Sequence, residues 1–487
     1  MIRAWIEQAA ARHGGDVYLA DARGSATLTY SGLLDVVRGT ERRLDDAGLP
    51  PGARVYVRLT DPLRYATALV ALIAAGRVAV PLDPAAPDSD VARVLGVARP
   101  AGMITPPAVA DGEEAGGAAG EGTHPFGISA IDFAPFTDGA PCGGIFLCTS
   151  GTTGTPKGIL LREEQLAHVA SSVVESHRLG RSDRGYCSLP LFHVNAEVVG
   201  VLATLRAGAY LAVDRKFSRR GFWDMIAADR ITWINAVPAI ISILSMDPPG
   251  VAPAGLRFVR SASAPLPLAS LERFQQALGV PVIETYGMTE AASMITANPL
   301  DGPRKPGSAG KPAGSEVRIA RLDGGAADPG DIGPVLIRGG GVIRSYAAGG
   351  RPGAIDADGW LNTGDLGYLD ADGYLFLVGR SDDVINRGGE KIYPREIEEI
   401  LLAQPGVRSA AVIGATDEVL GERPVAYVVP DVTAGADEVE ARLRTVCAER
   451  LPRHKQPSEF WLVDAMPLGP TGKISRRRLK ESVTAHP

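Results

Sequence analysis

The densest group of polar donors in the chain lies at residues 149–158, which read Thr-Ser-Gly-Thr-Thr-Gly-Thr-Pro-Lys-Gly. Three glycines let a polyanion approach the backbone, and five hydroxyl side chains together with Lys157 surround it with donors. Loops of this kind wrap phosphates with backbone N–H groups. It is not a Walker A loop, because no Gly-x-x-x-x-Gly-Lys-Ser/Thr register runs through it. The apolar run 144–148 predicts a buried strand leading into the loop, so we predict a phosphate site here rather than a solvated linker.

Residues 284–290, Glu-Thr-Tyr-Gly-Met-Thr-Glu, carry groups suited to a nucleotide phosphate. They follow an apolar run at 280–283, and ligands bind at strand ends in open α/β sheets. Glu290 could hold a magnesium ion that bridges phosphates, and Thr289 could donate to a phosphoryl oxygen. A helix cap formed by the same pair is the alternative interpretation.

Asp365 lies in residues 359–367, a stretch that predicts a tight turn. A carboxylate there could accept both hydroxyls of a ribose, although Thr-Gly-Asp is also common in turns without a function. Two cationic candidates complete the set. His193 follows an apolar run and precedes Asn195, while Lys473 stands on a glycine turn before three arginines. A lysine on a flexible stem can meet a carboxylate and a phosphate together, and the alternative for each cation is a solvated or core position.

Length and composition narrow the class of protein. A chain of 487 residues exceeds one hydrophobic core, and 45% apolar with 22% charged residues is typical of a globular protein. The net charge of −6 gives no electrostatic case for nucleic acid or an anionic membrane. Four cysteines without paired spacing favour a reducing compartment over a zinc site or disulfides. Early charges and the lack of a long apolar run indicate neither a signal peptide nor a membrane span, so we expect a cytoplasmic protein.

The elements that must position these residues alternate between helix and strand. A helix followed by a glycine and a short strand is predicted three times, at residues 66–82, 198–213 and 271–283. This alternation predicts an α/β fold of parallel sheets covered on both faces. After residue 315, short runs at 316–319, 335–337 and 374–378 predict antiparallel hairpins in a small, β-barrel-like subdomain.

A polar stretch at 379–383 marks a predicted boundary between a large domain, 1–381, and a small α+β domain, 382–487. The small domain should contain helices at 394–402 and 436–450 and strands at 410–413 and 425–429. A domain of this size on a short linker is expected to be mobile.

In this order the motifs resemble the ANL superfamily of adenylate-forming enzymes, which includes acyl- and aryl-CoA synthetases, non-ribosomal adenylation domains and luciferases. The resemblance extends from about residue 30 to 480. Its most specific segments are 149–158, 286–290, 363–365, 379–398 and 472–473.

The resemblance implies an ATP-dependent carboxylate-CoA ligase that uses ATP, Mg²⁺ and CoA. Such an enzyme forms an acyl-adenylate with release of pyrophosphate and then transfers the acyl group to the CoA thiol. The alternative is a stand-alone adenylation enzyme that serves a carrier protein in trans, an amine or another small nucleophile. His193 stands where amino-acid-activating domains commonly have aspartate, which favours CoA. A catalytically dead nucleotide-binding protein is disfavoured because Lys473, Glu290 and Asp365 are all present; light-emitting oxygenation is a further, rarer activity of the superfamily.

Matching positions imply roles for individual residues. The phosphates of ATP would be held by Thr149, Ser150, Gly151, Thr152, Thr153, Gly154 and Lys157. The adenine would lie against Ala262, Ser263, Ala264, Tyr286 and Gly287, and the ribose would bind Asp365 and Arg380.

The catalytic roles implied by the resemblance fall on four residues. Thr289 and Glu290 would serve the α-phosphate and magnesium, with Glu290 as the metal ligand. His193 would face the carboxylate and the departing pyrophosphate. Lys473 would bridge the attacking carboxylate and the nucleotide, where negative charge gathers in the transition state. Asp382 matches the hinge about which the small domain turns, exchanging Lys473 for the loop 388–391 between the two half-reactions.

Three segments, 256–263, 298–307 and 385–392, are most similar to the oxalate-CoA ligase group. That group usually has histidines where this chain has Asn195 and Ala292-Ser293. Losing two potential cations argues against a small dianion such as oxalate. We therefore expect a neutral, hydroxylated or amino-bearing acid in a pocket near Glu197, with substrate contacts from His193, Asn195, Asn235, Met288 and Ser293.

Overall fold

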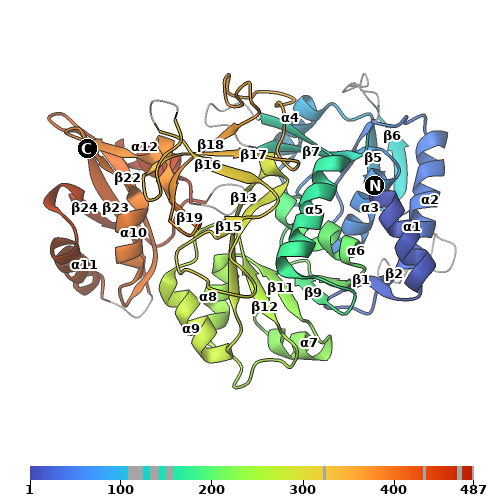
Figure 1. Ribbon diagram of the computed structural model, residues 1–487, viewed down its shortest axis with the longest axis horizontal. Helices are drawn as coiled ribbons and strands as arrows, with labels where there is room; N and C mark the ends of the chain where they lie inside the picture. Colours follow the sequence, from blue (N-terminus) through green and yellow to red (C-terminus); the bar gives the residue numbers. More distant parts are fainter. Residues whose placement is uncertain are drawn as a thin grey trace.

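The computed structural model describes residues 1–107, 124–131, 142–149, 157–321, 325–431, 435–468 and 474–484. Within these residues the chain forms four sheets, and helices pack against them. Figure 1 shows the C-terminal portion at one end of the molecule, beside β19 (Leu375–Arg380), with the N-terminus toward the other end. This mixed α/β architecture confirms the predicted fold class.

The largest sheet of the described residues has nine strands in the order β15-β14-β13-β12-β11-β9-β10-β1-β2. Its central pairs, from β1 to β13, are parallel, and the pairs at its two edges are antiparallel. The strands are β1 (Val17–Asp21), β2 (Thr27–Thr29), β9 (Arg184–Cys187), β10 (Tyr210–Val213), β11 (Trp233–Ala236), β12 (Phe258–Ser261), β13 (Val282–Met288), β14 (Ser293–Ala297) and β15 (Lys311–Pro312).

A second sheet runs β6-β5-β3-β4-β7-β8. Its strands are β3 (Arg54–Val57), β4 (Val78–Pro81), β5 (Gly102–Thr105), β6 (Gly127–Ala130), β7 (Gly144–Thr149) and β8 (Lys157–Arg162). The predicted strand before the phosphate loop is confirmed as β7. Because β7 and β8 are antiparallel and Thr149 pairs with Lys157, the two ends of the loop lie together.

Helices of the first 280 residues pack on these two sheets. They are α1 (Ile2–His13), α2 (Tyr30–Asp46), α3 (Pro62–Ala74), α4 (Asp88–Ala98), α5 (Glu163–His177), α6 (Ala203–Ala207), α7 (Phe222–Ala228), α8 (Pro238–Met246) and α9 (Leu268–Leu278). Asp61 caps α3 by accepting from the Arg64 N–H at 2.9 Å. Helix α3 contacts strands of both sheets, β1 and β3, and this explains why it is apolar on every face.

The helix predicted at 198–205 is confirmed as helical, but its bounds and its helix type differ from the prediction. The structure has a π-helix, η1 (Asn195–Leu202), followed by α6. All eight residues of η1 are buried, so its sequence is uniformly apolar apart from Asn195 and Glu197 and carries no period that separates a π-helix from an α-helix. π-Helices are rare and occur frequently at functional sites.

The predicted antiparallel region after residue 315 is confirmed as the sheet β16-β17-β18-β19. Its remaining strands are β16 (Glu316–Ile319), β17 (Gly333–Arg338) and β18 (Leu361–Leu369). The tight turn predicted around Asp365 is wrong, because Asp365 lies inside β18. Pairing shifts from Asn362 opposite Leu336 to Leu366 opposite Pro334, so β18 bulges at residues 363–365, with Gly364 at φ +77°. A glycine with positive φ followed by aspartate thus marks a bulge here rather than a turn.

The C-terminal portion forms its own sheet from β20 (Ile385–Arg387), β21 (Glu390–Ile392), β22 (Val407–Asp417), β23 (Gly421–Pro430) and β24 (Glu459–Leu462). Helices α10 (Pro394–Leu402), α11 (Ala436–Arg450) and α12 (Arg476–Thr484) accompany it, and both helices predicted here are confirmed. Short 3-10 turns occur at η2 (Thr289–Ala291), η3 (Ser381–Asp383) and η4 (Arg453–Lys455).

Two buried hydrophobic clusters of this portion contain, among the described residues, none that precedes Ile385. The predicted boundary after residue 381 is compatible with these separate clusters and stays a prediction. In the part of the chain that the structure describes, no helix is long and apolar enough to cross a membrane. All four cysteines are free.

Candidate active site

Three of the predicted nucleotide residues meet where β13, β18 and β19 end or bulge. The Tyr286 hydroxyl donates a short hydrogen bond to Asp365 Oδ2. Arg380 Nη1 donates to Asp365 Oδ1 at 3.0 Å and to the Thr363 carbonyl oxygen at 3.1 Å. Asp365 and Arg380 are cross-strand partners, so the sheet itself sets their spacing. The bulge turns the carboxylate of Asp365 toward Tyr286.

The Asp365 carboxylate retains acceptor capacity in this arrangement. Burial and the nearby Asp365 charge raise the pKa of Tyr286 well above its usual range, so its hydroxyl stays a donor. A carboxylate offers about four lone-pair sites, and the bonds to Tyr286 and Arg380 use one on each oxygen. The remaining sites suit two further donors on adjacent carbons, such as the hydroxyls of a ribose.

A second group forms around Glu290, which is buried in the 3-10 turn η2 after β13. Its Oε1 accepts from the Tyr346 hydroxyl at 3.1 Å, and its backbone oxygen accepts from the Ile343 N–H at 2.9 Å. Lys157 Nζ lies 5.4 Å from the centroid of the Tyr346 ring. The start of β8 therefore lies beside Glu290, and the loop ends at Thr149 and Lys157 face the same region.

The residues around Glu290 fit a magnesium ion bound together with a nucleotide. In the described parts of the chain, no group of three or more His, Cys, Asp or Glu side chains could hold a metal alone. Magnesium usually takes one or two carboxylates and completes its shell with phosphate oxygens and water. Glu290 can supply that carboxylate, since its protein partner is a hydroxyl group and not a cation.

Three non-glycine residues with positive φ lie beside these groups. Ser263, Ala292 and Ser293 have φ angles of +77°, +50° and +101°, which non-glycine residues rarely adopt. Gly287 approaches the backbone of β14 so closely that a Cβ would lie 1.5 Å from the Ser293 oxygen. Met288 and Ser293 are cross-strand partners at this point. Strain of this kind occurs preferentially at functional sites.

A third group lies at the carboxyl ends of β11 and β12. Asn195, from η1, accepts from Arg260 Nη1 through Oδ1 at 2.7 Å, and Asn235 accepts from the same nitrogen at 3.0 Å. The Asn195 amide also donates to Ser263 Oγ at 3.4 Å. The structure thus brings together the predicted residues Asn195, Asn235 and Ser263, and it adds Arg260.

The family follows from comparison with known proteins. Residues 6–143 and 145–347 match the AMP-binding enzyme family, and residues 396–473 match the AMP-binding enzyme C-terminal domain. This chain is an AMP-binding enzyme. The resemblance to adenylate-forming enzymes is thereby confirmed.

Among its relatives, a sulfoacetate–CoA ligase from Cupriavidus necator is 38% identical and covers 98% of this AMP-binding enzyme and 97% of the relative. An oxalate–CoA ligase from Arabidopsis thaliana is 34% identical over 93% of both chains. ATP-bound MatB from Rhodopseudomonas palustris has a TM-score of 0.85 at 27% identity and covers 99% of both chains. o-Succinylbenzoate CoA synthetase (MenE) from Bacillus subtilis, in complex with OSB-AMP, has a TM-score of 0.81 at 29% identity, over 98% of this chain and 97% of that chain.

Several predicted residues of this AMP-binding enzyme lie outside the described residues. They are Ser150, Gly151, Thr152, Thr153, Gly154 and Lys473. Asp382 is exposed in η3, as a hinge residue would be, and its role stays a prediction. His193 lies after the carboxyl end of β9, with its ring 4.6 Å from that of Phe192. Ala262 and Ala264 flank the strained Ser263, and Thr289 precedes Glu290 in η2.

Glu197 and Arg260 are the charged residues that this region of the AMP-binding enzyme buries most deeply. Both Glu197 carboxylate oxygens are buried without a hydrogen-bond partner in the described residues, and burial raises the pKa of this carboxyl. Arg260 was missed as a site residue, although an arginine inside the apolar strand 258–261 is the signal that identifies it.

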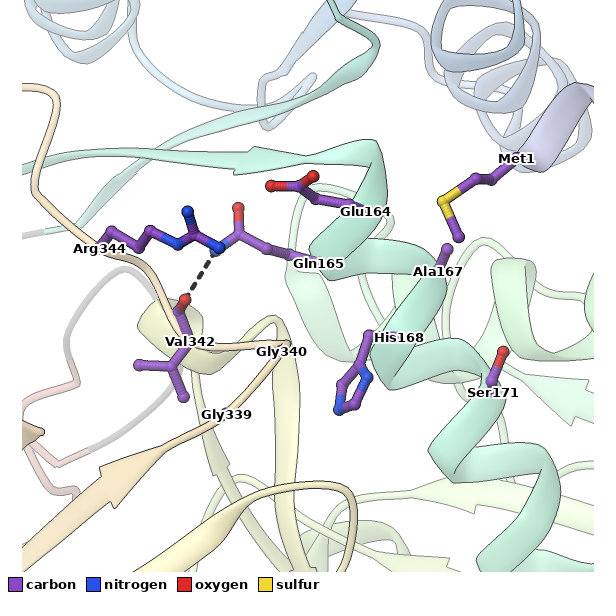
Figure 2. A pocket seen from close by; sticks show the side chains of 10 residues that line it. All are labelled: Met1, Glu164, Gln165, Ala167, His168, Ser171, Gly339, Gly340, Val342 and Arg344. Atoms are coloured by element: carbon purple, nitrogen blue, oxygen red, sulfur yellow. Dashed lines mark hydrogen bonds between the residues drawn. The ribbon is translucent and has the colours of Figure 1, made fainter. Parts of the chain in front are cut away.

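A separate groove of about 430 Å³ lies between α5 and residues 339–344 (Figure 2). The side-chain amide of Gln165 donates to the Val342 carbonyl oxygen at 2.9 Å and so ties α5 to the segment that leads to Tyr346. His168 binds the Gly314 carbonyl oxygen through Nε2 at 2.6 Å. None of the predicted site residues of the AMP-binding enzyme lines this groove, and its contacts hold the scaffold together.

Proposed function

We propose that this AMP-binding enzyme is an ATP-dependent carboxylate–CoA ligase that forms an acyl-adenylate and then an acyl-CoA thioester. The observation that carries the proposal is the convergence of two groups on the end of β13. The group of Tyr286, Asp365 and Arg380 suits a ribose, and Glu290 with Tyr346 and Lys157 suits phosphates and magnesium.

In the first step a carboxylate oxygen attacks the α-phosphorus of ATP, and the bond to the pyrophosphate oxygen breaks. Asp365 fixes the ribose, so the α-phosphate lies near Thr289 and His193. Glu290 would hold magnesium, which would supply positive charge that offsets the charge of the phosphates. Lys473 holds the attacking carboxylate against the nucleotide, where two negative groups would otherwise repel each other.

In the second step the CoA sulfur, as thiolate, attacks the acyl carbon and AMP leaves with the electron pair of the broken C–O bond. We propose that the C-terminal portion turns about Asp382 between the steps, which withdraws Lys473 and brings residues 388–391 to the site. The separate clusters beyond Ile385 support such a rigid-body movement.

The named relatives support CoA as the acceptor and suggest which acids to test. Their names specify CoA as the acceptor, so a carrier protein is not favoured here. Sulfoacetate and oxalate each carry a second acidic group, and acids of this type therefore belong in any substrate panel. The four free cysteines support a reducing, cytoplasmic location.

The test uses the purified full chain with ATP, Mg²⁺ and a panel of sulfocarboxylic, dicarboxylic, short-chain, aryl, hydroxy and amino acids. We expect ATP–pyrophosphate exchange without CoA for the true acid, and sustained AMP release with thioester formation only when CoA is added. Exchange with no acid would refute adenylate formation. Sustained AMP release that ignores CoA would instead favour another acceptor.

A further inference from the structure

Arg260 is a buried cation whose protein partners are all neutral. Its side chain is 1% exposed, and Nη1 donates to the amide oxygens of Asn195 and Asn235. Nε is fully buried without a hydrogen-bond partner. In the described residues, no carboxylate forms an ion pair with Arg260, and Glu197, two residues beyond Asn195, has no hydrogen bond to it.

An unpaired buried guanidinium is costly, so its retention calls for an explanation. Burial lowers the pKa of Arg260 to about 9, yet it remains charged at neutral pH. The two amide oxygens orient Nη1, and Nε is buried, so Nη2 is the guanidinium nitrogen left for a ligand among the described residues. A charged guanidinium nitrogen donates strong hydrogen bonds to carboxylates and related oxyanions.

The location of Arg260 ties it to the acid rather than to ATP. It lies in β12, three residues before the strained Ser263, and its partner Asn195 follows His193 by two residues. Asn235 is directly opposite Arg260 in β11. The guanidinium thus contacts two residues, Asn195 and Asn235, that the sequence analysis assigns to the acid.

We propose that Arg260 binds a second anionic group, a carboxylate or sulfonate, at the far end of the acid and thereby selects small dianionic acids. This inference rests on the proposed function and names its substrate class. It replaces the expectation of a neutral acid, which was based on two missing histidines and did not count the cation that β12 supplies.

The first test compares matched acids with the wild-type enzyme by ATP–pyrophosphate exchange. The pairs are malonate with propionate, succinate with butyrate, and sulfoacetate with propionate. We expect kcat/KM for at least one dianion to exceed that of its partner by on the order of 100-fold, because a site built for a polar group rejects an analogue that lacks it. The size of this ratio for sulfoacetate against malonate distinguishes a sulfonate site from a carboxylate site.

The second test uses Arg260→Gln and Arg260→Lys. The glutamine should abolish most of the preference by raising KM for the dianion, and lysine should restore part of it because the charge returns without the fixed position of Nη2. Arg77→Gln is the control for loss of a buried arginine, since Arg77 is also buried but donates to the backbone oxygens of Leu49 and Ala75 and to Asp45 Oδ1. It should lower thermal stability without changing the ratio between paired acids.

Three outcomes decide the matter. A wild-type enzyme that prefers the monoanion in every pair overturns this inference alone, even if the Arg260 variants do not fold. If Arg260→Gln loses activity equally with both members of a pair, Arg260 only holds η1 against the sheet. That result also overturns the inference. Failure of every acid to support exchange overturns the proposed function and the inference with it.

Discussion

Replacing Asp365 by asparagine tests the ribose site most directly. The carboxylate accepts from Tyr286 on one oxygen and from Arg380 on the other. An amide keeps one acceptor oxygen, and its NH₂ group then faces one of these two donors. The variant therefore has less capacity left for a diol, and one of its protein partners loses its acceptor.

The expected loss can be estimated from these contacts. A hydrogen bond to a charged acceptor contributes about 1.5–3 kcal/mol. The asparagine loses one hydrogen bond to the ribose and makes the other to a neutral acceptor, so the total loss of binding free energy is about 2–4 kcal/mol. That corresponds to a decrease of roughly 30- to 900-fold in kcat/KM for ATP. The effect on folding should be smaller, because the Arg380 side chain is 44% exposed and its ion pair with Asp365 is screened by solvent.

The assay is ATP–pyrophosphate exchange with ATP and with 2′-deoxy-ATP. The wild-type enzyme should discriminate against the deoxynucleotide by on the order of 10- to 100-fold, whereas Asp365→Asn should lose most of this discrimination. Asp370→Asn is the matched control, since Asp370 follows β18 and accepts from Lys305 without any contact to the site. Unchanged discrimination in Asp365→Asn would refute the ribose role.

The remaining predictions concern the lysine, the metal and pH. Lys473→Ala should slow adenylate formation by on the order of 10²–10³-fold while thioester formation from preformed acyl-adenylate continues; equal losses in single-turnover assays of both steps would contradict the assigned role. Glu290→Gln should raise the Mg²⁺ concentration for half-maximal exchange at least ~10-fold, and an unchanged requirement would exclude Glu290 as the metal ligand. Burial raises the pKa of Glu284 from 4.5 to about 7, so the folded state holds this proton more tightly than the unfolded state. The stabilisation that this proton contributes is therefore complete below pH 4.5 and is lost as pH rises through about 7. The melting temperature of Glu284→Gln should lack this decrease with pH. Parallel pH profiles of melting temperature for the two proteins would contradict the prediction.

Much of the fold could be predicted because its elements obey simple periodicity. Helix α10 begins at Pro394, and α11 was predicted with its bounds correct, since the flanking signals were local. The bulge at Asp365 could not be distinguished from a turn, because both use a glycine with positive φ, and only the partner strand β17 decides between them. The π-helix η1 escaped prediction for a related reason, since a fully buried segment carries no polar face to reveal its period.

The same contrast between local and long-range signals applies to the candidate site. Residues recognised through contiguous motifs, such as Tyr286 and Asp365, come together in space as predicted. The group of Arg260, Asn195 and Asn235 is assembled from β11, β12 and η1, which are distant in sequence, so the contact of Arg260 with Asn195 could not be predicted from spacing. A lone arginine in an apolar strand predicts that a polar or anionic group compensates its charge. The sequence alone does not identify that group.

The hydrophobic clusters beyond Ile385 have a consequence for the association of the C-terminal portion with the rest of the chain. Each part keeps its own interior, so a cut within Ser381–Asp383 would leave two pieces that can stay folded. In the intact chain, the proposed mechanism would present Lys473 to the nucleotide at the millimolar effective concentration typical of a short tether. Once severed, the smaller piece would behave as a diffusible activator, and adenylate formation would rise with its concentration until the pieces saturate each other.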